Sequence, residues 1–295
     1  HDLILKVRMI KELIKSKLKS HPNFYAGRLN KKNLFRSFTA SPRILPDFII
    51  IGEAKCGTTS LYNYMIQHPN IKSALTKEIN YFNWNYEKSI NWYKAHFPTT
   101  LEKKIKIRNK EAFLTGEATP LYLFHLSVPK RIFKLLPKLK IIICLRNPVN
   151  RAYSHYNDLG VRLGNDKRTF DEAVKLEMES IKKIDDLVGN SKYGFEDRLY
   201  QYVSRGIYLD HLKIWMKTFP KKQFFIVKTE ELNKTPKVVL DNIFKFLSLP
   251  EFNEINIKER YNVSKYNSMS ESTRNLLNNF FKIHNQRLEE YLKIK

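Results

Sequence analysis

The stretch "DFIIIGEAKCGTTSLYNYM" (residues 47–65) joins an apolar strand pattern, a glycine-bounded turn and a helical pattern. This order predicts an anion-binding loop, because N–H groups of the turn and of the helix start point at one place. Gly52 and Gly57 have the spacing of a Walker phosphate loop, but Thr58 stands where that loop carries its lysine. The lysine of this turn is Lys55. The loop therefore predicts a phosphate site that differs from that of a nucleotide kinase.

A second apolar stretch, "KIIICLRNP" (residues 140–148), ends in the cation Arg146. A kinase needs a carboxylate for magnesium, commonly at the end of a neighbouring strand. An arginine that ends a buried strand is costly unless an anion or a carboxylate meets it. Pro148 favours a helix start, which places Ser154 within the first two turns of that helix. Arg146 and Ser154 can thus face one phosphate, and an anionic nucleotide bound without a metal is expected.

Strand patterns alternate with amphipathic helical patterns from residue 46 onward. The predicted strands are 47–52, about 112–117, 140–146 and 223–228. The predicted helices are 58–67, 129–137, 149–159, 170–184, 207–219, 236–247 and 271–292. Strands separated by helices predict an α/β fold, here P-loop-like and three-layered, with helices on both faces of a mainly parallel sheet. Ligands then collect at the carboxyl ends of the strands.

Residues 1–45 form a predicted basic extension, with 11 Lys/Arg against 2 Asp/Glu, and residues 46–295 form the predicted catalytic domain. Apolar residues recur at helical spacing within 3–18. Such a helix in residues 1–20 either lies on an anionic membrane or packs against protein, and both alternatives stay open. Because the chain starts at His1, a preceding anchor, as in a Golgi-lumen enzyme, also stays open.

The whole chain is basic, with 53 Lys/Arg against 29 Asp/Glu in 295 residues. This excess favours anionic partners, although a solvated basic surface explains part of it. Cys56 and Cys144 are the only cysteines, so a disulfide framework is not expected. The cysteine content fits a reducing compartment, and a cytoplasmic protein, with or without peripheral membrane contact, is expected.

Two motifs resemble those of sulfotransferases that use 3′-phosphoadenosine 5′-phosphosulfate (PAPS). "PDFIIIGEAKCGTTSLYNYMIQHPNI" (46–71) is similar to their 5′-phosphosulfate loop, and "CLRNPVNRAYSHY" (144–156) to their 3′-phosphate motif. Further segments resemble the heparan-sulfate branch and its prokaryotic relatives: "KEINYFNW" (77–84), "INWYKAHFP" (90–98), "GEATPLYL" (116–123), "SRGIYLDHLKIWMKTFP" (204–220) and the stretch from 261 to 292. The resemblance implies PAPS as donor and 3′,5′-ADP (PAP) as product, without a metal. It also implies a hydroxyl or amine acceptor, with a saccharide favoured over a small metabolite, and no nucleic-acid partner.

The resemblance assigns roles to particular residues. Glu78 becomes the general base, with a surface ion pair as its alternative, and Lys55 meets the charge that grows on the leaving phosphate. The implied donor-binding residues are Lys55, Cys56, Gly57, Thr58, Thr59, Ser60, Arg146, Ser154, Tyr208 and Lys265. The implied acceptor-binding residues are Lys77, Glu117 and His155. Packing is the alternative for Cys56 and Tyr208, and a structural role is favoured for Arg151.

Two positions depart from animal heparan-sulfate 3-O-sulfotransferases. Ala118 stands where those enzymes have lysine, and Asn80 where they have histidine. A heparan substrate is therefore not assigned. Two other classes remain open: a magnesium-dependent nucleotide kinase, suggested by the glycine spacing, and a non-catalytic module that binds anions or membranes, suggested by the net charge of +24.

Overall fold

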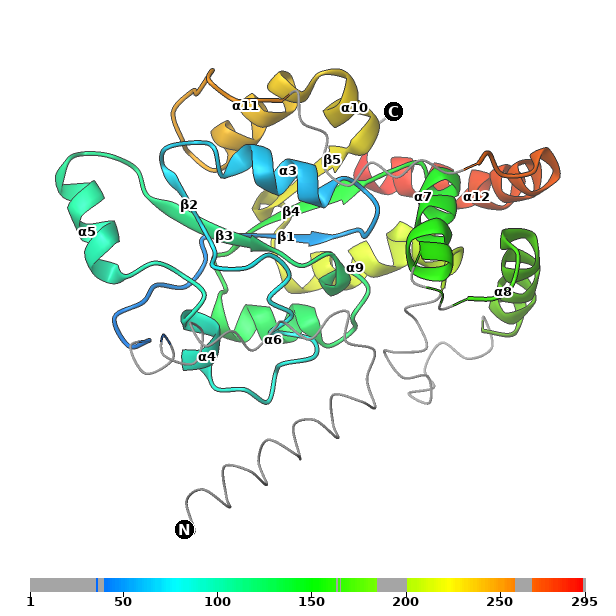
Figure 1. Ribbon diagram of the computed structural model, residues 1–295, viewed down its shortest axis with the longest axis horizontal. Helices are drawn as coiled ribbons and strands as arrows, with labels where there is room; N and C mark the ends of the chain where they lie inside the picture. The colour runs from blue at the N-terminus through cyan, green and yellow to red at the C-terminus, as the bar shows by residue number, and fades with distance from the viewer. Residues whose placement is uncertain are drawn as a thin grey trace, which may run out of the picture.

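A central parallel sheet lies between two layers of helices in the computed structural model (Figure 1). The structure describes residues 36, 40–162, 164, 166–184, 201–257 and 267–293. The amphipathic helix predicted within residues 3–18 lies outside these residues, as does Lys265.

The sheet has five strands in the order β2-β3-β1-β4-β5, and each neighbouring pair is parallel. The strands are β1 (Phe48–Gly52), β2 (Ile71–Ser73), β3 (Leu114–Ala118), β4 (Lys140–Leu145) and β5 (Phe224–Lys228). The predicted α/β class and four predicted strands are confirmed. The sequence did not indicate β2, because three residues are too few for a strand pattern.

Helices cover both faces of the sheet. The α-helices are α3 (Thr58–Met65), α4 (Ile90–Lys94), α5 (Thr100–Arg108), α6 (Val128–Leu135), α7 (Pro148–His155), α8 (Phe170–Ile184), α9 (Tyr208–Thr218), α10 (Thr229–Lys234), α11 (Pro236–Phe246) and α12 (Glu271–Leu292). Figure 1 shows α3 and α11 on one side of the sheet and α6 and α9 on the other. All seven predicted helices are present. The unpredicted ones are short, and α5 buries none of its residues, so it carries no apolar face to detect.

Strand β1 is buried on both sides, which explains its uninterrupted apolar run. Ile49 and Ile51 belong to the apolar core beneath α9, which includes Trp215. Phe48 and Ile50 belong to the opposite core, which includes Leu61 of α3. The strand therefore has no face exposed to solvent, and the first charged residue, Glu53, follows directly after the strand ends at Gly52.

Helix α7 starts where β4 ends. Asn147 caps it by accepting hydrogen bonds from the N–H groups of Val149 and Asn150, both at 3.1 Å, and Pro148 occupies the first turn as predicted. The α-helix ends at His155 and continues as the π-helical segment Tyr156–Arg162, so the helix predicted for 149–159 changes type before its end. A π-helix has a wider turn than an α-helix, so the angular spacing of the side chains changes after His155.

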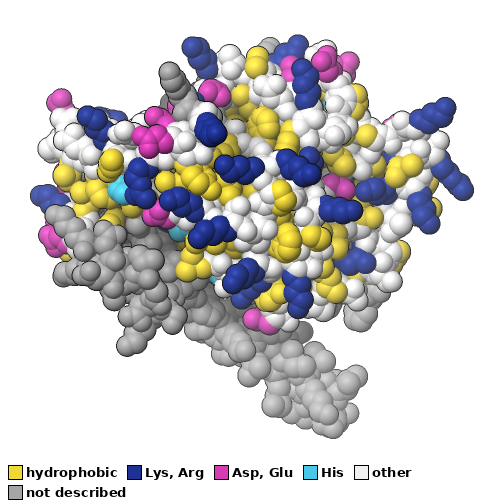
Figure 2. Space-filling model, turned by 180° about the vertical axis from the view of Figure 1, so that it is seen from behind, with side chains coloured by type: hydrophobic (Ala, Val, Ile, Leu, Met, Phe, Trp, Pro, Cys, Tyr) yellow, Lys and Arg dark blue, Asp and Glu magenta, His cyan; other side chains and the backbone are white. Residues whose placement is uncertain are grey.

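Basic side chains are spread over the molecular surface. Figure 2 shows Lys and Arg across the whole visible face, interspersed with apolar groups, and not gathered in one place. This distribution fits the prediction that a solvated basic surface explains part of the charge excess. Among the described helices, none is both long enough and apolar enough to cross a membrane.

Candidate active site

The predicted anion-binding loop lies at the carboxyl end of β1. Lys55 and Gly57 have left-handed backbone conformations, with φ of 68° and 79°. Gly57 is the N-cap of α3 and supplies no capping side-chain bond, so no side chain of its own covers this helix start. A Cβ at Gly57 would lie 3.5 Å from Thr229 Cγ2 and would strain this backbone. The residues that open α3 are Thr58, Thr59 and Ser60, as the sequence predicts.

Arg146 reaches from the end of β4 to this loop. Its Nη1 donates a hydrogen bond to the carbonyl oxygen of Lys55 at 3.1 Å. The Tyr208 hydroxyl holds the backbone of Arg146, because it donates a hydrogen bond to the Arg146 carbonyl at 2.8 Å. Thr229, which the sequence did not single out, donates to the carbonyls of Cys56 at 2.8 Å and Leu145 at 2.9 Å. The two predicted phosphate-binding segments therefore form one unit.

Cys56 points into the protein interior. Its Sγ lies 3.8 Å from the Tyr208 hydroxyl, and burial, assisted by the charge of Glu53, raises the pKa of the thiol to about 12. The thiol is therefore protonated at neutral pH. This placement favours the packing alternative for the Cys56 and Tyr208 side chains, while the Cys56 backbone remains part of the loop.

Ser154 lies on α7 and is largely buried, at 7% exposure. Arg151 is fully buried, donates to the carbonyl of Tyr202, and lies with its Nη1 3.3 Å from His155 Nδ1. Burial and the charges of Arg205, Arg151 and Lys55 hold the pKa of His155 well below its ordinary value. These contacts fit the structural role that the sequence favoured for Arg151. His155 is neutral and buried in this structure, and its contact with an acceptor stays a prediction.

A buried ion pair underlies the loop. The guanidinium of Arg205 contacts Glu53 Oε1, and the exposures of their side chains are 1% and 0%. Arg205 also lies over the ring of Phe124, at 4.0 Å from its centroid, and the N–H of Ala54 donates to Glu53 at 2.8 Å. The sequence indicated the Ser204–Gly206 turn only as part of the segment 204–220 that carries the family resemblance. The Glu53 partner gave no signal, because the two residues lie 152 positions apart.

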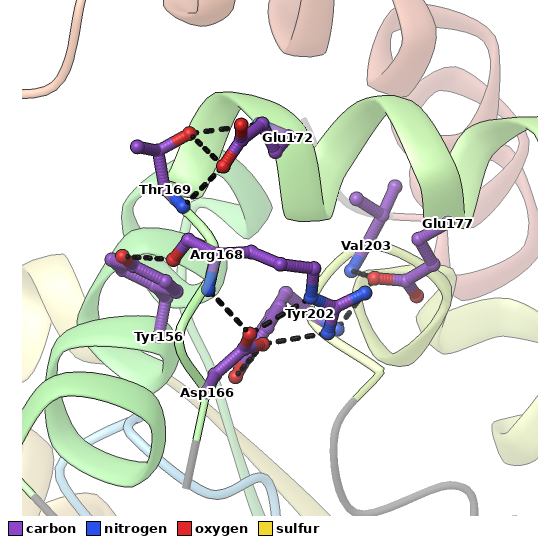
Figure 3. Close-up of polar contacts among 8 residues, drawn as sticks. All are labelled: Tyr156, Asp166, Arg168, Thr169, Glu172, Glu177, Tyr202 and Val203. Atoms are coloured by element: carbon purple, nitrogen blue, oxygen red, sulfur yellow. Dashed lines mark hydrogen bonds and ion pairs between the residues drawn. The ribbon is translucent and has the colours of Figure 1, made fainter. Parts of the chain in front are cut away.

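The turn that carries Arg205 is held by Glu177 of α8 (Figure 3). The carboxylate of Glu177 accepts hydrogen bonds from the N–H groups of Tyr202, Val203 and Ser204 at 2.7–2.8 Å, and from the Ser204 hydroxyl at 2.7 Å. Hydrogen bonds to a charged acceptor are stronger than neutral ones. Glu177 therefore anchors this turn and, through it, positions Arg205 beside Glu53.

Glu78 lies beside the sheet edge, in the loop that follows β2. Its N–H donates to the carbonyl of Ala118 at 3.0 Å, and its backbone is left-handed, with φ of 61°. Its carboxylate forms an ion pair with Lys77 at 2.6 Å and is 35% exposed. A non-glycine residue in this conformation is strained, and such residues cluster at functional sites. The carboxylate is thus accessible, and the ion pair with Lys77 is present.

The two departures from the animal enzymes both border Glu78. Asn80 is buried, donates from Nδ2 to the Glu78 carbonyl at 2.8 Å, and accepts from Asn83 at 3.0 Å. Ala118 is fully buried. In this chain, Asn80 therefore supports the backbone of Glu78 from inside the protein.

Glu117 is fully buried beneath this loop. It accepts hydrogen bonds from the hydroxyls of Tyr93 at 2.6 Å, Thr119 at 2.7 Å and Tyr122 at 3.5 Å. Burial raises the pKa of Glu117 to about 7, although these hydrogen bonds oppose the shift. Three hydroxyl groups therefore surround the carboxylate. In this structure Glu117 organises the core beneath Glu78.

Lys55 has one further contact that the sequence did not indicate. Its Nζ lies 3.1 Å from Oδ2 of Asp158 in the π-helical segment.

No group of three or more potential metal ligands occurs among the described residues.

Comparison with known proteins identifies the family. The sulfotransferase domain model matches residues 45–289. The chain belongs to the sulfotransferase family. It is 32% identical to heparan sulfate glucosamine 3-O-sulfotransferase 5 of Mus musculus, over 78% of this chain and 58% of the relative. It is 26% identical to the membrane-associated sulfotransferase kil1 of Dictyostelium discoideum, over 91% of this chain and 70% of the relative.

A solved structure supports the same family. The sulfotransferase from Alicyclobacillus acidocaldarius matches with a TM-score of 0.64 and 26% identity, over 85% of this chain and 97% of that one. The chain spans only 31% of a bifunctional heparan sulfate N-deacetylase/N-sulfotransferase of Caenorhabditis elegans, to which it is 28% identical. The predicted family is therefore confirmed, and the matched region is a sulfotransferase domain.

Proposed function

We propose that this protein transfers a sulfuryl group from PAPS to a hydroxyl or amine of an acceptor, without a metal. The observation that carries the proposal is the contact between Arg146 and the Lys55 carbonyl at 3.1 Å. This contact joins a helix-start anion site to a strand-end cation. A nucleotide with phosphates at both its 5′ and 3′ positions would use both parts at once.

The residues of the loop fit the donor. PAPS, when bound, supplies the sulfuryl group that is transferred. Lys55 and the N–H groups of Gly57, Thr58 and Thr59 would hold the 5′-phosphosulfate end and stabilise negative charge there. The left-handed backbone at Gly57, with φ of 79°, favours glycine at the residue that caps this helix start.

The 3′-phosphate would be held by Arg146 and Ser154, and Lys265 is a further predicted ligand. A charge-assisted hydrogen bond from a guanidinium to a phosphate is among the strong ones in proteins. Tyr208 contributes indirectly, because its hydroxyl fixes the Arg146 backbone at 2.8 Å. Arg146 is thus held both at its guanidinium and at its backbone carbonyl. This restraint lowers the entropic cost of binding an anion.

Glu78 is the proposed general base. Its carboxylate would take the proton of the acceptor's hydroxyl or amine as the acceptor atom bonds to sulfur. The bond between sulfur and the 5′-phosphate oxygen would break in the same step, so that 3′,5′-ADP leaves. Such a base must lie within hydrogen-bond reach of the proton that it removes. The exposure of the Glu78 carboxylate, 35% beside Lys77, leaves it open to an acceptor. Lys77 would then hold the carboxylate in place.

The first test measures nucleotide binding by calorimetry. We expect 3′,5′-ADP to bind without metal at micromolar or submicromolar Kd, and 5′-AMP to bind more weakly. Arg146→Ala should weaken the binding of 3′,5′-ADP by about 2–4 kcal/mol, so that its affinity comes close to that of 5′-AMP. The control Arg108→Ala removes an exposed charge at the end of α5 and should leave the Kd within about twofold. Tighter binding of ATP with magnesium would instead support the kinase alternative, and absence of nucleotide binding would support the non-catalytic module.

A saccharide acceptor is favoured over a small metabolite, since the names of several relatives specify heparan sulfate. Transfer of labelled sulfate from PAPS to desulfated heparan sulfate, compared with transfer to small phenols and guanidinium compounds, tests this choice. Contact with a membrane surface through residues 1–20, in the cytoplasm or in a lumen, is a separate proposal. Sedimentation with anionic vesicles, with and without those residues, tests that contact.

A further inference from the structure

A carboxylate lies inside a site that is otherwise suited to anions. Asp158 Oδ2 is 3.1 Å from Lys55 Nζ, and the side chains are 27% and 17% exposed. The proposed function gives Lys55 to the 5′-phosphate end of a nucleotide, so a fixed negative charge beside it opposes binding. This contact therefore calls for a role of its own.

The helix that carries Ser154 also carries this carboxylate. Asp158 lies four residues after Ser154, in the π-helical segment that directly continues α7. The wider turn of a π-helix changes the direction of the side chains that follow it, and such segments are frequent at functional sites. Asp158 is thus aimed at the loop by the same element that presents the predicted 3′-phosphate serine.

Asp158 has a second cationic partner. Arg162 Nε lies 2.7 Å from its other oxygen, Oδ1, and the Arg162 side chain is 51% exposed. Burial alone would raise the pKa of Asp158, but Lys55 and Arg162 outweigh burial and lower it below its ordinary value. The carboxylate is therefore charged at neutral pH, and it would keep Arg162 as a partner after Lys55 moved to another anion.

We propose that Asp158 is a positioning residue of the donor site. It pairs with Lys55 in the free protein and releases Lys55 to the 5′-phosphate when the nucleotide binds. Asp158 then keeps Arg162 as its partner. This proposal rests on the proposed function. Two consequences follow. Donor affinity is set below what the loop alone would provide, and the opposing effect is confined to ligands that carry a 5′-phosphate.

The test compares three ligands on wild type and Asp158→Asn by calorimetry at constant salt. We expect 3′,5′-ADP and 5′-AMP to bind about threefold to tenfold more tightly to D158N, because Lys55 is released from a partly buried ion pair. Adenosine 3′-phosphate lacks the 5′-phosphate, so its Kd should stay within about twofold. Glu111→Gln is the matched control, since it removes the carboxylate partner of Lys106 on another surface and should change none of the three.

Arg162→Gln provides a second variant with the opposite sign. Among the described residues it leaves Lys55 as the remaining ion-pair partner of Asp158, so 3′,5′-ADP should bind about threefold more weakly. Since this change also removes a nearby positive charge, it is repeated in the D158N background, where the loss should shrink. An equal loss in both backgrounds would contradict the exchange of partners.

The outcomes separate the two proposals. If wild type binds 3′,5′-ADP but D158N binds it equally or more weakly, the role of Asp158 is wrong and the donor site stands. If D158N tightens all three ligands equally, the effect is general electrostatics and the role of Asp158 is again overturned. If wild type binds no adenine nucleotide, the proposed function fails, and this inference fails with it.

Discussion

The proposed donor side of the site, around Lys55 and Arg146, and the proposed acceptor side, around Glu78, are held in different ways. On the donor side, Arg146, Tyr208 and Thr229 come from the ends of different elements and bond to backbone atoms of the loop or to one another. On the acceptor side, Glu78 stands in a loop, and its carboxylate meets the adjacent Lys77. The first arrangement joins side chains from several elements. In the second, β3 holds the Glu78 backbone through the Ala118 carbonyl, but the carboxylate pairs only with its sequence neighbour among the described residues.

This difference indicates which part of the site can vary. Strand ends packed into two apolar cores leave little freedom for Arg146 or the loop at 52–57. Beside Glu78, a partly exposed side chain such as Lys77 can change without disturbing the core, whereas Ile79, Tyr81 and Phe82 belong to that core. The two positions predicted to differ from animal 3-O-sulfotransferases both border Glu78, with Asn80 in its loop and Ala118 at the end of β3.

The sharpest test of the comparison is Glu78→Gln. Transfer of sulfate from PAPS should fall about 10²- to 10⁴-fold, because the base is lost, while the Kd of 3′,5′-ADP stays within about twofold. Glu87→Gln, an exposed carboxylate farther along the same loop, is the matched control and should keep full turnover. Parallel losses of turnover and nucleotide binding in E78Q would show that the two sides are not separable.

A second test breaks the support beneath the donor loop. Arg205→Met should lower the free energy of unfolding by about 3–5 kcal/mol, because Glu53 is left as an uncompensated buried charge. Chemical denaturation measures the loss, and adding Glu53→Gln should restore part of it. Lys106→Met, which breaks an exposed pair with Glu111, should cost at most about 1 kcal/mol. Equal costs for the two pairs would contradict a buried scaffold.

The smallest expected effect concerns the core beneath Glu78. Burial raises the pKa of Glu117 to about 7 in the folded protein, so the folded state keeps this proton to higher pH than the unfolded state does. The free energy of unfolding should therefore fall as the pH rises from about 4.5 to about 7, and level off above that. Glu117→Gln should remove about 2 kcal/mol of this decline between pH 5 and pH 8, measured by urea unfolding. An unchanged pH profile would show that Glu117 does not titrate in this range.

The donor side was predictable because its signals are local. Gly52, Lys55 and Gly57 stand in one turn, and Arg146 follows an apolar strand directly, so strand and turn patterns indicate both halves of the site. The parallel arrangement then requires their ends to meet at one edge. The short elements β2, α4 and α10 gave weaker patterns, since each has few residues with which to show a period, and α5 has no buried face.

Only the tertiary structure decided which charges meet. Glu53 with Arg205, Glu177 with the turn at 202–204, and Lys55 with Asp158 are separated in sequence by 25 to 152 positions. Their pairing depends on how α7, α8 and the sheet pack, which no local pattern records. The sequence by itself determined the fold class, the loop, the strand-end cation and the family resemblance, because each depends on residues close together in the chain. The partners of the buried and half-buried charges were decided by packing, because a charge removed from water is stable only beside whatever the fold brings to it.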